Sequence, residues 1–450
     1  MVNMNKRDIR FKEQVGIVTS EATSDQFKFF VTPLTNSLGS LGVEKEDYVL
    51  VDHPFLGEAC PLLAVVKELR NYEEVVGTSL RESKSVKTTA SVEIIGCVDI
   101  RDPQVKFLRQ AAIPPKPGSR VFLPYLEFLE DVFSRTYDGK PFKRPIYIGE
   151  LESNANSREG GLKRLNFYFD SEDFTKHHIL ISAISGSGKT YAATVMVEEV
   201  VNKTGLPVVI LDPYSEYTTV GVPGKRFNEL KAIGKPGIND YPFSFEVSVH
   251  TFNSESVIKK LEKVGIDLKS DNRLTVQPFS SQFLKTSEDQ FELKMKDELN
   301  EEVRHNRVTI LDSKGLTQEE TRRLFTSYVD TLLHNRLDER GEPFLLVVEE
   351  PRRLEPEVLY RIASEGRKLG VTMCILSQHP IEIDGRVLSQ IGTHIMGRTT
   401  DATDLDYLKQ IAGDKLSLLS HLRPGEWAVN NSNMDKIVKI HVRERYSLSI

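Results

Sequence analysis

The sequence of 450 residues predicts an α/β fold in which a small all-β domain precedes a larger domain with a parallel central sheet. Three observations lead to this prediction. Residues 1–125 contain short, alternating apolar runs separated by turn residues, which is typical of β-structure. From residue 176 onward, buried strands alternate with helices, which indicates a parallel sheet. Between the first of these strands and its helix lies a glycine-rich loop, residues 183–190.

The first domain is expected over residues 1–125. Its predicted strands are short and rich in β-branched and aromatic residues. They are Gln14–Thr19, Gln26–Val31, Tyr48–Asp52, Leu63–Lys67 and Ser91–Gly96. Such a series of short strands predicts a small barrel or a sandwich.

Residues 126–170 are expected to connect the two domains. Before them, Pro114–Gly118 stiffens the chain, and Val121–Leu123 is expected to lead out of the first domain. The glycine, proline and polar residues of Gly139–Pro145 and Asn154–Gly161 predict a linker with a docking hairpin.

The second domain is expected over residues 171–450. Its further strands are predicted at Leu206–Asp212, Arg307–Asp312, Phe344–Val348 and Val371–Leu376. Thr317–Glu320 has the spacing of a capping box and predicts the start of a helix with an apolar face. Residues 224–305 are charged and weakly periodic, which predicts a helical insertion with mobile loops. Residues 420–450 are expected to form a hairpin and tail.

The glycine-rich loop, Ala-Ile-Ser-Gly-Ser-Gly-Lys-Thr, follows the apolar run His178–Ser182 and precedes a helical pattern. Strand, glycine loop and helix together predict a phosphate-binding loop, because successive amides and the helix N-terminus attract phosphate oxygens. Lys189 is expected to reach the terminal phosphates, and the Thr190 hydroxyl to ligate Mg²⁺. The predicted nucleotide-binding residues are Ser185, Gly186, Ser187, Gly188, Lys189 and Thr190. The loop therefore predicts ATP with Mg²⁺ as the ligand, and the alternative is a chance glycine turn before a helix.

The loop departs from the usual pattern at its first position, where Ala183 replaces glycine. Alanine does not tolerate every positive-φ conformation, so a slightly altered turn is expected there.

Polar residues follow other predicted strands of the same domain. Glu349 and Glu350 end an apolar strand, and we expect the first to hold the magnesium shell through water and the second to deprotonate the attacking water. Gln378, at the end of another strand, is expected to sense the γ-phosphate or hold that water. Asp212 and Glu216 are expected at the same edge of the sheet, Asp212 contributing to nucleotide binding. The alternatives are a solvated glutamate pair, an ordinary strand end and a structural turn.

The order of these motifs resembles the HerA–FtsK branch of ring-forming ATPases, and the HerA group most closely. The residues that carry the resemblance are Asp212–Tyr217, Glu349–Glu350, Glu365–Gly370, Ser377–Pro380, Leu422–Trp427 and His441–Arg445, together with the glycine loop. Residues 10–125 are similar to the amino-terminal β-barrel of that family, the HAS barrel. The resemblance thus covers nearly the whole chain.

The resemblance implies a RecA-like P-loop ATPase core and a homo-hexameric, ATP-dependent translocase or helicase of double-stranded DNA. It also implies a nuclease partner such as NurA in DNA end processing or repair, or a defence effector as in bacterial relatives. The chain departs from the family in reading Glu349-Glu-Pro-Arg352 instead of Asp-Glu-Ala-His.

A second departure concerns the family's arginine that acts on the neighbouring subunit's nucleotide. Lys176 stands near its usual place. Arg367 and Arg398 are therefore the candidate arginines, with Lys176 as a cationic stand-in. For Arg367 the alternative is an intramolecular salt bridge with Glu365 or Glu350.

Composition sets limits on partners and location. The longest apolar stretches reach only about six residues, far below the roughly 20 that span a bilayer, and no signal peptide is evident, so we expect a cytoplasmic protein. The net charge of −6 neither indicates nor excludes a nucleic-acid partner. The three cysteines, Cys60, Cys97 and Cys374, are expected to be buried small hydrophobic residues.

DNA contacts are expected on glycine-rich loops that carry Lys225, Arg226, Lys231 and Lys235, with a solvated surface loop as the alternative. Two alternative functions stay open at this point. One is an ATPase scaffold of a nuclease or effector complex with little translocation, and the other is a ring motor that moves proteins or peptides.

Overall fold

The computed structural model describes most of the chain and divides it into two compact units. The described residues are 11–32, 42–55, 57–76, 83–99, 106–108, 113–135, 140–151, 165–233, 241, 245–268, 273–279, 303–305, 307–338, 342–413, 416–431 and 437–448. The first unit comprises Met1–Lys143, Glu150–Tyr168 and Asn433–Lys436, and the second comprises Arg144–Gly149, Phe169–Ser432 and Ile437–Ile450. The predicted docking hairpin at Asn154–Gly161 lies outside the described residues.

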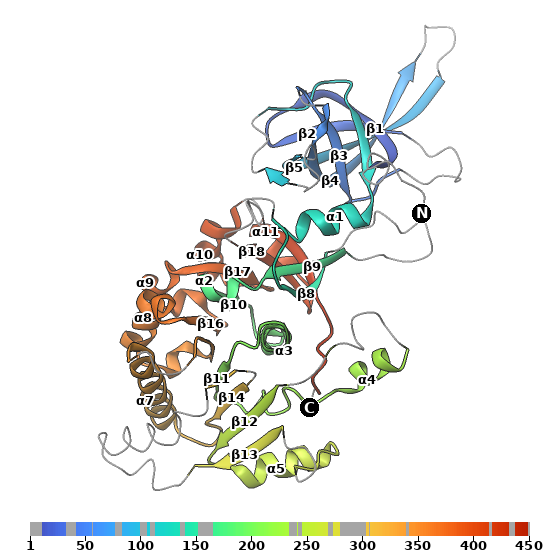
Figure 1. The fold of residues 1–450 in the computed structure, drawn as a ribbon. Helices are drawn as coiled ribbons and strands as arrows, with labels where there is room; N and C mark the ends of the chain where they lie inside the picture. Colours follow the sequence, from blue (N-terminus) through green and yellow to red (C-terminus); the bar gives the residue numbers. More distant parts are fainter. Residues whose placement is uncertain are drawn as a thin grey trace. The chain divides into compact units, whose positions relative to one another are not determined.

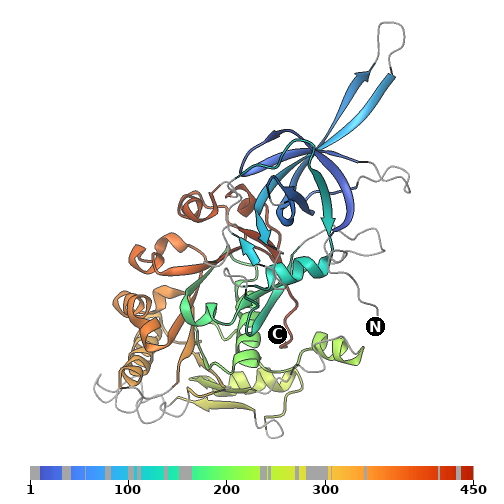
Figure 2. The ribbon, with the colours of Figure 1, turned by 45° about the horizontal axis from the view of Figure 1, so that its top comes forward.

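The first unit contains an antiparallel barrel, as Figures 1 and 2 show. Its strands are β1 (Phe11–Ala22), β2 (Gln26–Val31), β3 (Tyr48–His53), β4 (Gly57–Val76), β5 (Ser83–Asp99), β6 (Lys106–Leu108) and β7 (Arg120–Pro124), and helix α1 (Leu126–Phe133) follows. The strand order is β2-β1-β7-β3-β4-β5-β6, and an additional β2–β5 pairing closes the ring. The predicted all-β barrel is confirmed.

Strand β7 corrects one expectation about this barrel. It pairs with both β1 and β3, and its residues Val121 and Leu123 are buried in the barrel core. The prediction that Val121–Leu123 leads out of the domain was therefore wrong. The alternation of Val121 and Leu123 with exposed or half-buried neighbours is the pattern of a strand with one buried face.

Two of the three cysteines lie on paired barrel strands. Cys60 on β4 and Cys97 on β5 are buried and joined by a disulfide, whereas Cys374 is buried and free. The expectation of a buried small hydrophobic residue is confirmed for Cys374 and is wrong for the other pair. The sequence alone does not indicate this disulfide, because the two cysteines are 37 residues apart. Only the pairing of β4 with β5 brings them together.

The second unit contains a large, mostly parallel sheet. Its strands are β10 (His178–Ser182), β11 (Val208–Asp212), β12 (Glu246–Thr251), β13 (Leu274–Pro278), β14 (Arg307–Asp312), β15 (Phe344–Glu349), β16 (Val371–Ser377), β17 (Ile391–Met396), β18 (Glu426–Asn431) and β19 (Val438–Val442). They are ordered β13-β12-β14-β11-β15-β16-β10-β17-β18-β19, after which the sheet continues to β8 (Pro145–Leu151) and β9 (Leu165–Asp170). Every pairing from β13 to β17 is parallel. This is the predicted α/β class with a parallel central sheet.

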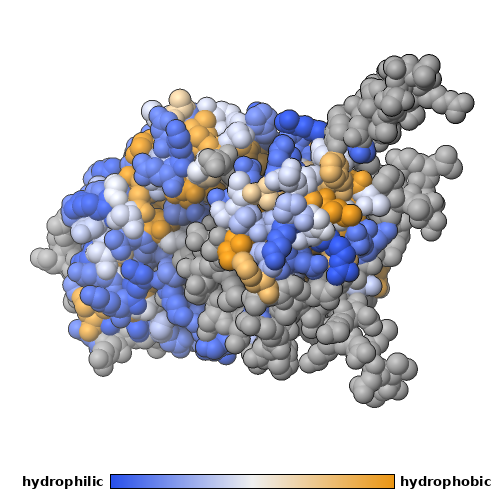
Figure 3. All heavy atoms as spheres, turned by 90° about the horizontal axis from the view of Figure 1, so that it is seen from above, coloured by the Kyte–Doolittle hydropathy of each residue, from blue (hydrophilic) through white to orange (hydrophobic). Residues whose placement is uncertain are grey.

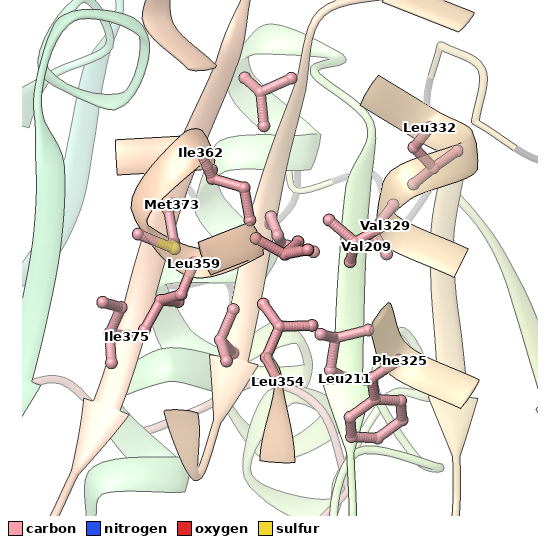
Figure 4. Close-up of a cluster of buried hydrophobic side chains, with 14 of the residues drawn as sticks. Val209, Leu211, Phe325, Val329, Leu332, Leu354, Leu359, Ile362, Met373 and Ile375 are labelled. Carbon is pink, nitrogen blue, oxygen red and sulfur yellow. The ribbon is translucent and has the colours of Figure 1, made fainter. Parts of the chain in front are cut away.

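Helices cover both faces of this sheet (Figure 1). They are α2 (Asp173–Lys176), α3 (Lys189–Thr204), α4 (Lys225–Ala232), α5 (Ser254–Lys263), α7 (Gln318–Leu337), α8 (Pro356–Glu365), α9 (Gly385–Leu388), α10 (Ala402–Ala412) and α11 (Leu416–His421), with short 3₁₀ turns η3 (Pro351–Arg353), η4 (Gly366–Leu369) and η5 (Pro380–Glu382). The predicted capping box at Thr317 and Glu320 is present and opens α7. Figure 4 shows α7 and α8 packed on the sheet through Phe325, Val329, Leu359 and Ile362.

The region predicted as a helical insertion, residues 224–305, also contains sheet strands. Between α4 and α5 lies β12, and β13 follows α5, so both strands extend the parallel sheet. The purely helical expectation was wrong. The six residues of β12 bury every side chain but the first, and the charged residues around so short a run hide it in a longer sequence window.

Surface apolar residues are scattered on the barrel. Ile17 and Phe30 are cross-strand neighbours with exposed fractions of 43% and 41%. On the face drawn in Figure 3, apolar residues form small groups among polar ones. None of the described helices combines the length and apolar composition of a bilayer-spanning helix.

His178 is a buried histidine at the start of β10. The Met373 amide donates to its Nδ1 at 3.0 Å, so its Nε2 carries the proton and donates to the Ala363 carbonyl at 3.0 Å. Burial lowers the pKa of His178 to about 4, an effect that the bond to Ala363 opposes. The neutral ring therefore links β10, β16 and α8.

Replacement of His178 by leucine is expected to reduce stability at pH 7.5 but also to reduce acid sensitivity. The two lost hydrogen bonds cost about 1 kcal/mol each. Because the folded-state pKa lies below the ordinary value of 6.5, the stability that the neutral ring supports is present above pH 6.5 and is lost as pH falls toward 4. Thermal unfolding at pH 7.5 and at pH 5 measures this effect. A fall in Tm between the two pH values that is equal in wild type and in His178→Leu would contradict it.

Candidate active site

The glycine loop joins β10 to α3 and has the backbone that the sequence predicted. Gly186 and Gly188 have φ values of +76° and +92°, in the left-handed region that favours glycine. Nothing lies within 4 Å of the position that a Cβ would take on Gly186, so that side of the loop is open. Helix α3 begins at Lys189, and its first amides have no partners within the helix. The loop thus has the form of an anion cradle.

Ala183 fits at the first loop position because of a second glycine. Ala183 is buried and is not among the described non-glycine residues with positive φ. A Cβ on Gly397 would lie 2.7 Å from the Ala183 Cβ, so the missing side chain at Gly397 leaves room for the alanine methyl. The alanine methyl is therefore accommodated beside Gly397, the residue that follows β17.

Lys189 points into the loop. Its ammonium donates to the carbonyls of Ala183 at 2.9 Å and Ile184 at 3.4 Å. Burial lowers the pKa of Lys189, and the nearby carboxylates of Glu349, Glu350 and Glu216 oppose that shift. The cation is thus held at the centre of the cradle, where an anionic ligand would offset its burial.

The Thr190 hydroxyl brings two carboxylates together. It donates to Oε2 of Glu216 at 2.7 Å and lies 3.0 Å from Oε1 of Glu349. Burial raises the pKa of Glu349 to about 8, and the charges of Asp212 and Glu216 add to this. The Oε2 atom of Glu349 is buried and has no hydrogen-bond partner among the described residues. Oxygen ligands with one oxygen unpaired fit a hard divalent cation such as Mg²⁺, which would favour the charged carboxylates.

Asp212 has its carboxylate directed into its own turn. It accepts hydrogen bonds from the amides of Tyr214 at 3.1 Å and Tyr217 at 3.0 Å. Burial raises the pKa of Asp212 to about 6, although these amide bonds work against the rise. This geometry matches the structural-turn alternative. The turn presents Glu216, rather than Asp212, to Thr190.

Glu349 and Glu350 diverge at the end of β15. Glu350 has φ +61° and ψ +79°, an unfavourable left-handed conformation for a residue with a side chain. The change of direction occurs at Glu350 itself, before the 3₁₀ turn that begins at Pro351. Glu350 is nearly buried and accepts a hydrogen bond from Nε of Arg352 at 2.9 Å.

Glu350 and Gln378 line one cavity of about 530 Å³ at the carboxyl ends of β15 and β16. Its other lining residues are Arg322, Pro351, Arg352, Leu354, Glu355, Pro356, Leu359, Ser377, His379, Glu382, Ile383 and Asp384. The structure thus brings the predicted base and the predicted amide to the same space, although no residue of the glycine loop is among the lining residues of this cavity.

The candidate cations lie at opposite edges of the sheet. The Ile184 amide donates to the Arg398 carbonyl at 2.9 Å, so Arg398 lies next to the glycine loop. Arg367 precedes β16 and donates to the carbonyl of Lys176, which precedes β10, at 3.2 Å. Arg367 and Lys176 therefore lie together at the amino-terminal edge, away from the chain's own loop. The alternative for Arg367, a salt bridge with Glu365 or Glu350, is not among the ion pairs of the described residues, where Glu350 pairs with Arg352.

Three of the four predicted DNA-contacting residues lie on a helix and not on a mobile glycine loop. Lys225, Arg226 and Lys231 belong to α4, and Lys235 lies outside the described residues. Arg226 pairs with Glu444, and Lys225 lies 3.9 Å from Glu229. For Lys225, Arg226 and Lys231 the loop expectation was wrong, because the sequence after Gly224 supports a helical turn with its own ion pairs.

A buried ionic cluster behind the loop was missed by sequence reasoning. Glu198 and Glu199 on α3 are almost fully buried, and Nη2 of Arg443 lies 3.1 Å and 3.0 Å from their carboxylates. Glu198 also accepts the amides of Tyr446 and Ser447, so the carboxyl-terminal tail is fixed along α3. The available signal was two acids inside an apolar helical run, Tyr191–Val201.

Replacement of Arg443 by methionine is expected to destabilise the second unit by about 3–5 kcal/mol, because two buried carboxylates lose their cation. Urea unfolding of the variant measures this effect. Adding Glu198→Gln and Glu199→Gln to the variant is expected to restore part of the loss, since the amides need no counter-charge. A single variant as stable as wild type would contradict the assignment.

Comparisons with known proteins agree with the motifs. Residues 146–261 match the family described as the central domain of helicase HerA. The chain is 23% identical to the DNA double-strand break repair helicase HerA of Pyrococcus furiosus, over 92% of this chain and 89% of that protein. It is 24% identical to the protein of the same name from Saccharolobus solfataricus, over 73% and 72% of the two chains.

Among solved structures, VirB4 of Thermoanaerobacter pseudethanolicus is similar with a TM-score of 0.39 and 14% identity, over 67% of this chain and 96% of that one. The conjugative coupling protein TrwB gives a TM-score of 0.37 and 13% identity, over 69% and 96%. The chain is thus similar to HerA-type helicases over most of its length, and the family match spans the glycine loop and helix α3.

Proposed function

We propose that this protein is an ATP-driven motor that translocates or unwinds double-stranded DNA. The observation that carries the proposal is the meeting of the Thr190 hydroxyl with two carboxylates directly behind the glycine loop and Lys189. This arrangement suits binding and hydrolysis of ATP with Mg²⁺. Relatives over most of the chain are named DNA double-strand break repair helicases, which supports DNA as the substrate.

In this proposal each residue has a distinct task. Thr190, Glu349 and Glu216 would hold Mg²⁺, which supplies positive charge to the phosphates. Lys189 and the loop amides bind the terminal phosphates and stabilise the charge that develops on them. Glu350 takes the proton of the attacking water, and Gln378 in the same cavity orients that water. Asp212 holds the turn that positions Glu216.

The proposed assembly is a homo-hexamer that works with a nuclease similar to NurA or with a defence effector. Arg367 supports the ring, because it is an exposed cation next to Lys176 at the edge of the sheet remote from its own loop, whereas the Lys176 ammonium pairs with Glu172. A neighbouring subunit's phosphates are the partner that such a cation would suit. Arg398, beside the chain's own loop, is then the cation that acts within the subunit.

Linear duplex DNA is expected to stimulate ATP hydrolysis several-fold, because a translocase couples turnover to movement along its track. Steady-state phosphate release with and without DNA measures this, with the Lys189→Ala variant as the control for contaminating ATPases. Hydrolysis that depends on Lys189 but does not respond to duplex DNA of any length would favour the alternative, an ATPase scaffold of a nuclease or effector complex.

A further inference from the structure

The ion pair between Arg352 and Glu350 joins an exposed cation to a nearly buried acid. The Arg352 side chain is 61% exposed and that of Glu350 only 10%. We propose that Arg352 is a positioning residue that restrains Glu350, and that transfer of Arg352 to Glu382 across the cavity releases the base for hydrolysis. This inference rests on the proposed ATPase function and names a control element of the same site.

The backbone around the pair is fixed more firmly than the Arg352 side chain. Glu350 holds its left-handed conformation before Pro351, and the Arg353 amide donates to the Glu350 carbonyl at 2.9 Å. From α7, Arg322 donates to the Arg352 carbonyl at 3.4 Å. The Arg352 guanidinium, by contrast, has Glu350 as its hydrogen-bonded side-chain partner and otherwise faces open space. The element that can move is therefore the arginine side chain.

Glu382 offers a second position for that side chain. It lies on η5, lines the same cavity of about 530 Å³ and is exposed. The pKa of Arg352 is raised chiefly by its hydrogen bond to Glu350, and the charge of Glu382 adds to this effect. Two acids thus compete for one cation across a space large enough for an arginine side chain to cross.

The strand that carries Gln378 can link this competition to the nucleotide. Turn η5 follows β16 directly, and Asp404 of α10 anchors it by accepting from the Ile381 amide at 3.2 Å and by contacting Nδ1 of His379 at 2.9 Å. A shift of the β16 end that carries η5 and α10 with it would therefore move Glu382 relative to Arg352. Such a shift would be coupled to the phosphates through Gln378.

Release of Arg352 makes the Glu350 carboxylate available as a general base. Glu350 must offer a carboxylate lone pair to a water proton, and the hydrogen bond from Arg352 occupies Oε2 and stabilises the charged carboxylate. With Arg352 on Glu382, both oxygens of Glu350 face the cavity. The water oxygen then bonds to the γ-phosphorus while the bond from that phosphorus to the bridging oxygen of the leaving ADP breaks, and the proton of the water passes to Glu350.

The test compares Arg352→Gln, Arg352→Lys and Glu382→Gln in the full chain, with kcat and KM for ATP measured with and without linear duplex DNA. Arg352→Gln is expected to raise kcat without DNA several-fold at unchanged KM, and so to lower the stimulation by DNA. Arg352→Lys, which keeps the charge, is expected to stay near wild type. Glu382→Gln is expected to lower the DNA-stimulated rate. Arg386→Gln is the matched control, because Arg386 pairs with Asp384 and Glu357 away from Glu350.

A kcat of Arg352→Gln equal to or below the wild-type value would overturn the restraint. A fall that Arg352→Lys rescues would show instead that the pair orients the base productively, which also overturns it. Failure of the proposed function is distinguishable, because wild type and Lys189→Ala would then show the same residual hydrolysis under all conditions. If hydrolysis depends on Lys189 but Arg352→Gln leaves kcat unchanged, this inference fails and the proposed ATPase function stands.

Discussion

Replacement of Lys189 by alanine is expected to abolish ATP hydrolysis and leave the fold intact. The Lys189 ammonium lies at the centre of the glycine loop and donates to two of its carbonyls. A charge that contacts the terminal phosphates contributes several kcal/mol to the transition state, which corresponds to a loss of about a thousandfold or more in rate. Phosphate release under saturating ATP measures the loss, and circular dichroism with the unfolding midpoint monitors the fold.

The matched control for this variant is Lys203→Ala. Lys203 is an exposed lysine in the last turn of the same helix, α3, so its removal changes the charge equally without touching the loop. Near-normal turnover in Lys189→Ala would remove the assignment of residues 183–190 as the phosphate site. Equal losses in both variants would point to an effect of net charge.

Replacement of Glu350 by glutamine is expected to give a chain that binds ATP but turns it over about 10²–10⁴-fold more slowly. The amide keeps the shape of the side chain and loses the proton acceptor. Equilibrium binding of a fluorescent ATP analogue and single-turnover hydrolysis separate these two steps. Binding at wild-type affinity with slow chemistry is the expected combination.

Glu349→Gln distinguishes the roles of the two acids. It is expected to weaken the dependence of nucleotide binding on Mg²⁺, because Glu349 is the carboxylate that lies beside Thr190. Glu355→Gln serves as a further control, since Glu355 lines the same cavity as Glu350 but its carboxylate lies beside Arg322, at 3.8 Å. If Glu349→Gln traps ATP and Glu350→Gln remains active, the roles of the two acids are reversed.

The glycine loop could be predicted because its geometry is local. Left-handed glycines, the strand before them and the helix after them are encoded within about 25 consecutive residues, and the structure has all three. The same holds for the capping box of α7 and for most barrel strands. Strand β12 escaped prediction because six residues among charged neighbours carry too little periodic signal.

The fold of residues around Ala183 could not be predicted from the loop alone. Whether alanine fits there depends on Gly397, which is more than 200 residues away in sequence and next to it across β10 and β17. The burial of Glu198 and Glu199 likewise depends on Arg443 from the tail. In both cases the deciding partner is distant in sequence, and one sequence without aligned relatives contains no record of such contacts.

By itself, the sequence determined the α/β class with a preceding barrel, the family resemblance and the set of polar residues at the ends of the sheet strands. Only the tertiary structure decided which of these residues contact one another. Glu216 accepts a hydrogen bond from Thr190, whereas Asp212 accepts from the amides of its own turn. Glu350 points away from Glu349 and accepts a hydrogen bond from Arg352. The physical reason is that strand periodicity fixes which residues reach the sheet edge. The direction of each side chain there depends on backbone turns such as φ +61° at Glu350, whose amide donates to the Leu376 carbonyl of the neighbouring strand β16 at 3.3 Å.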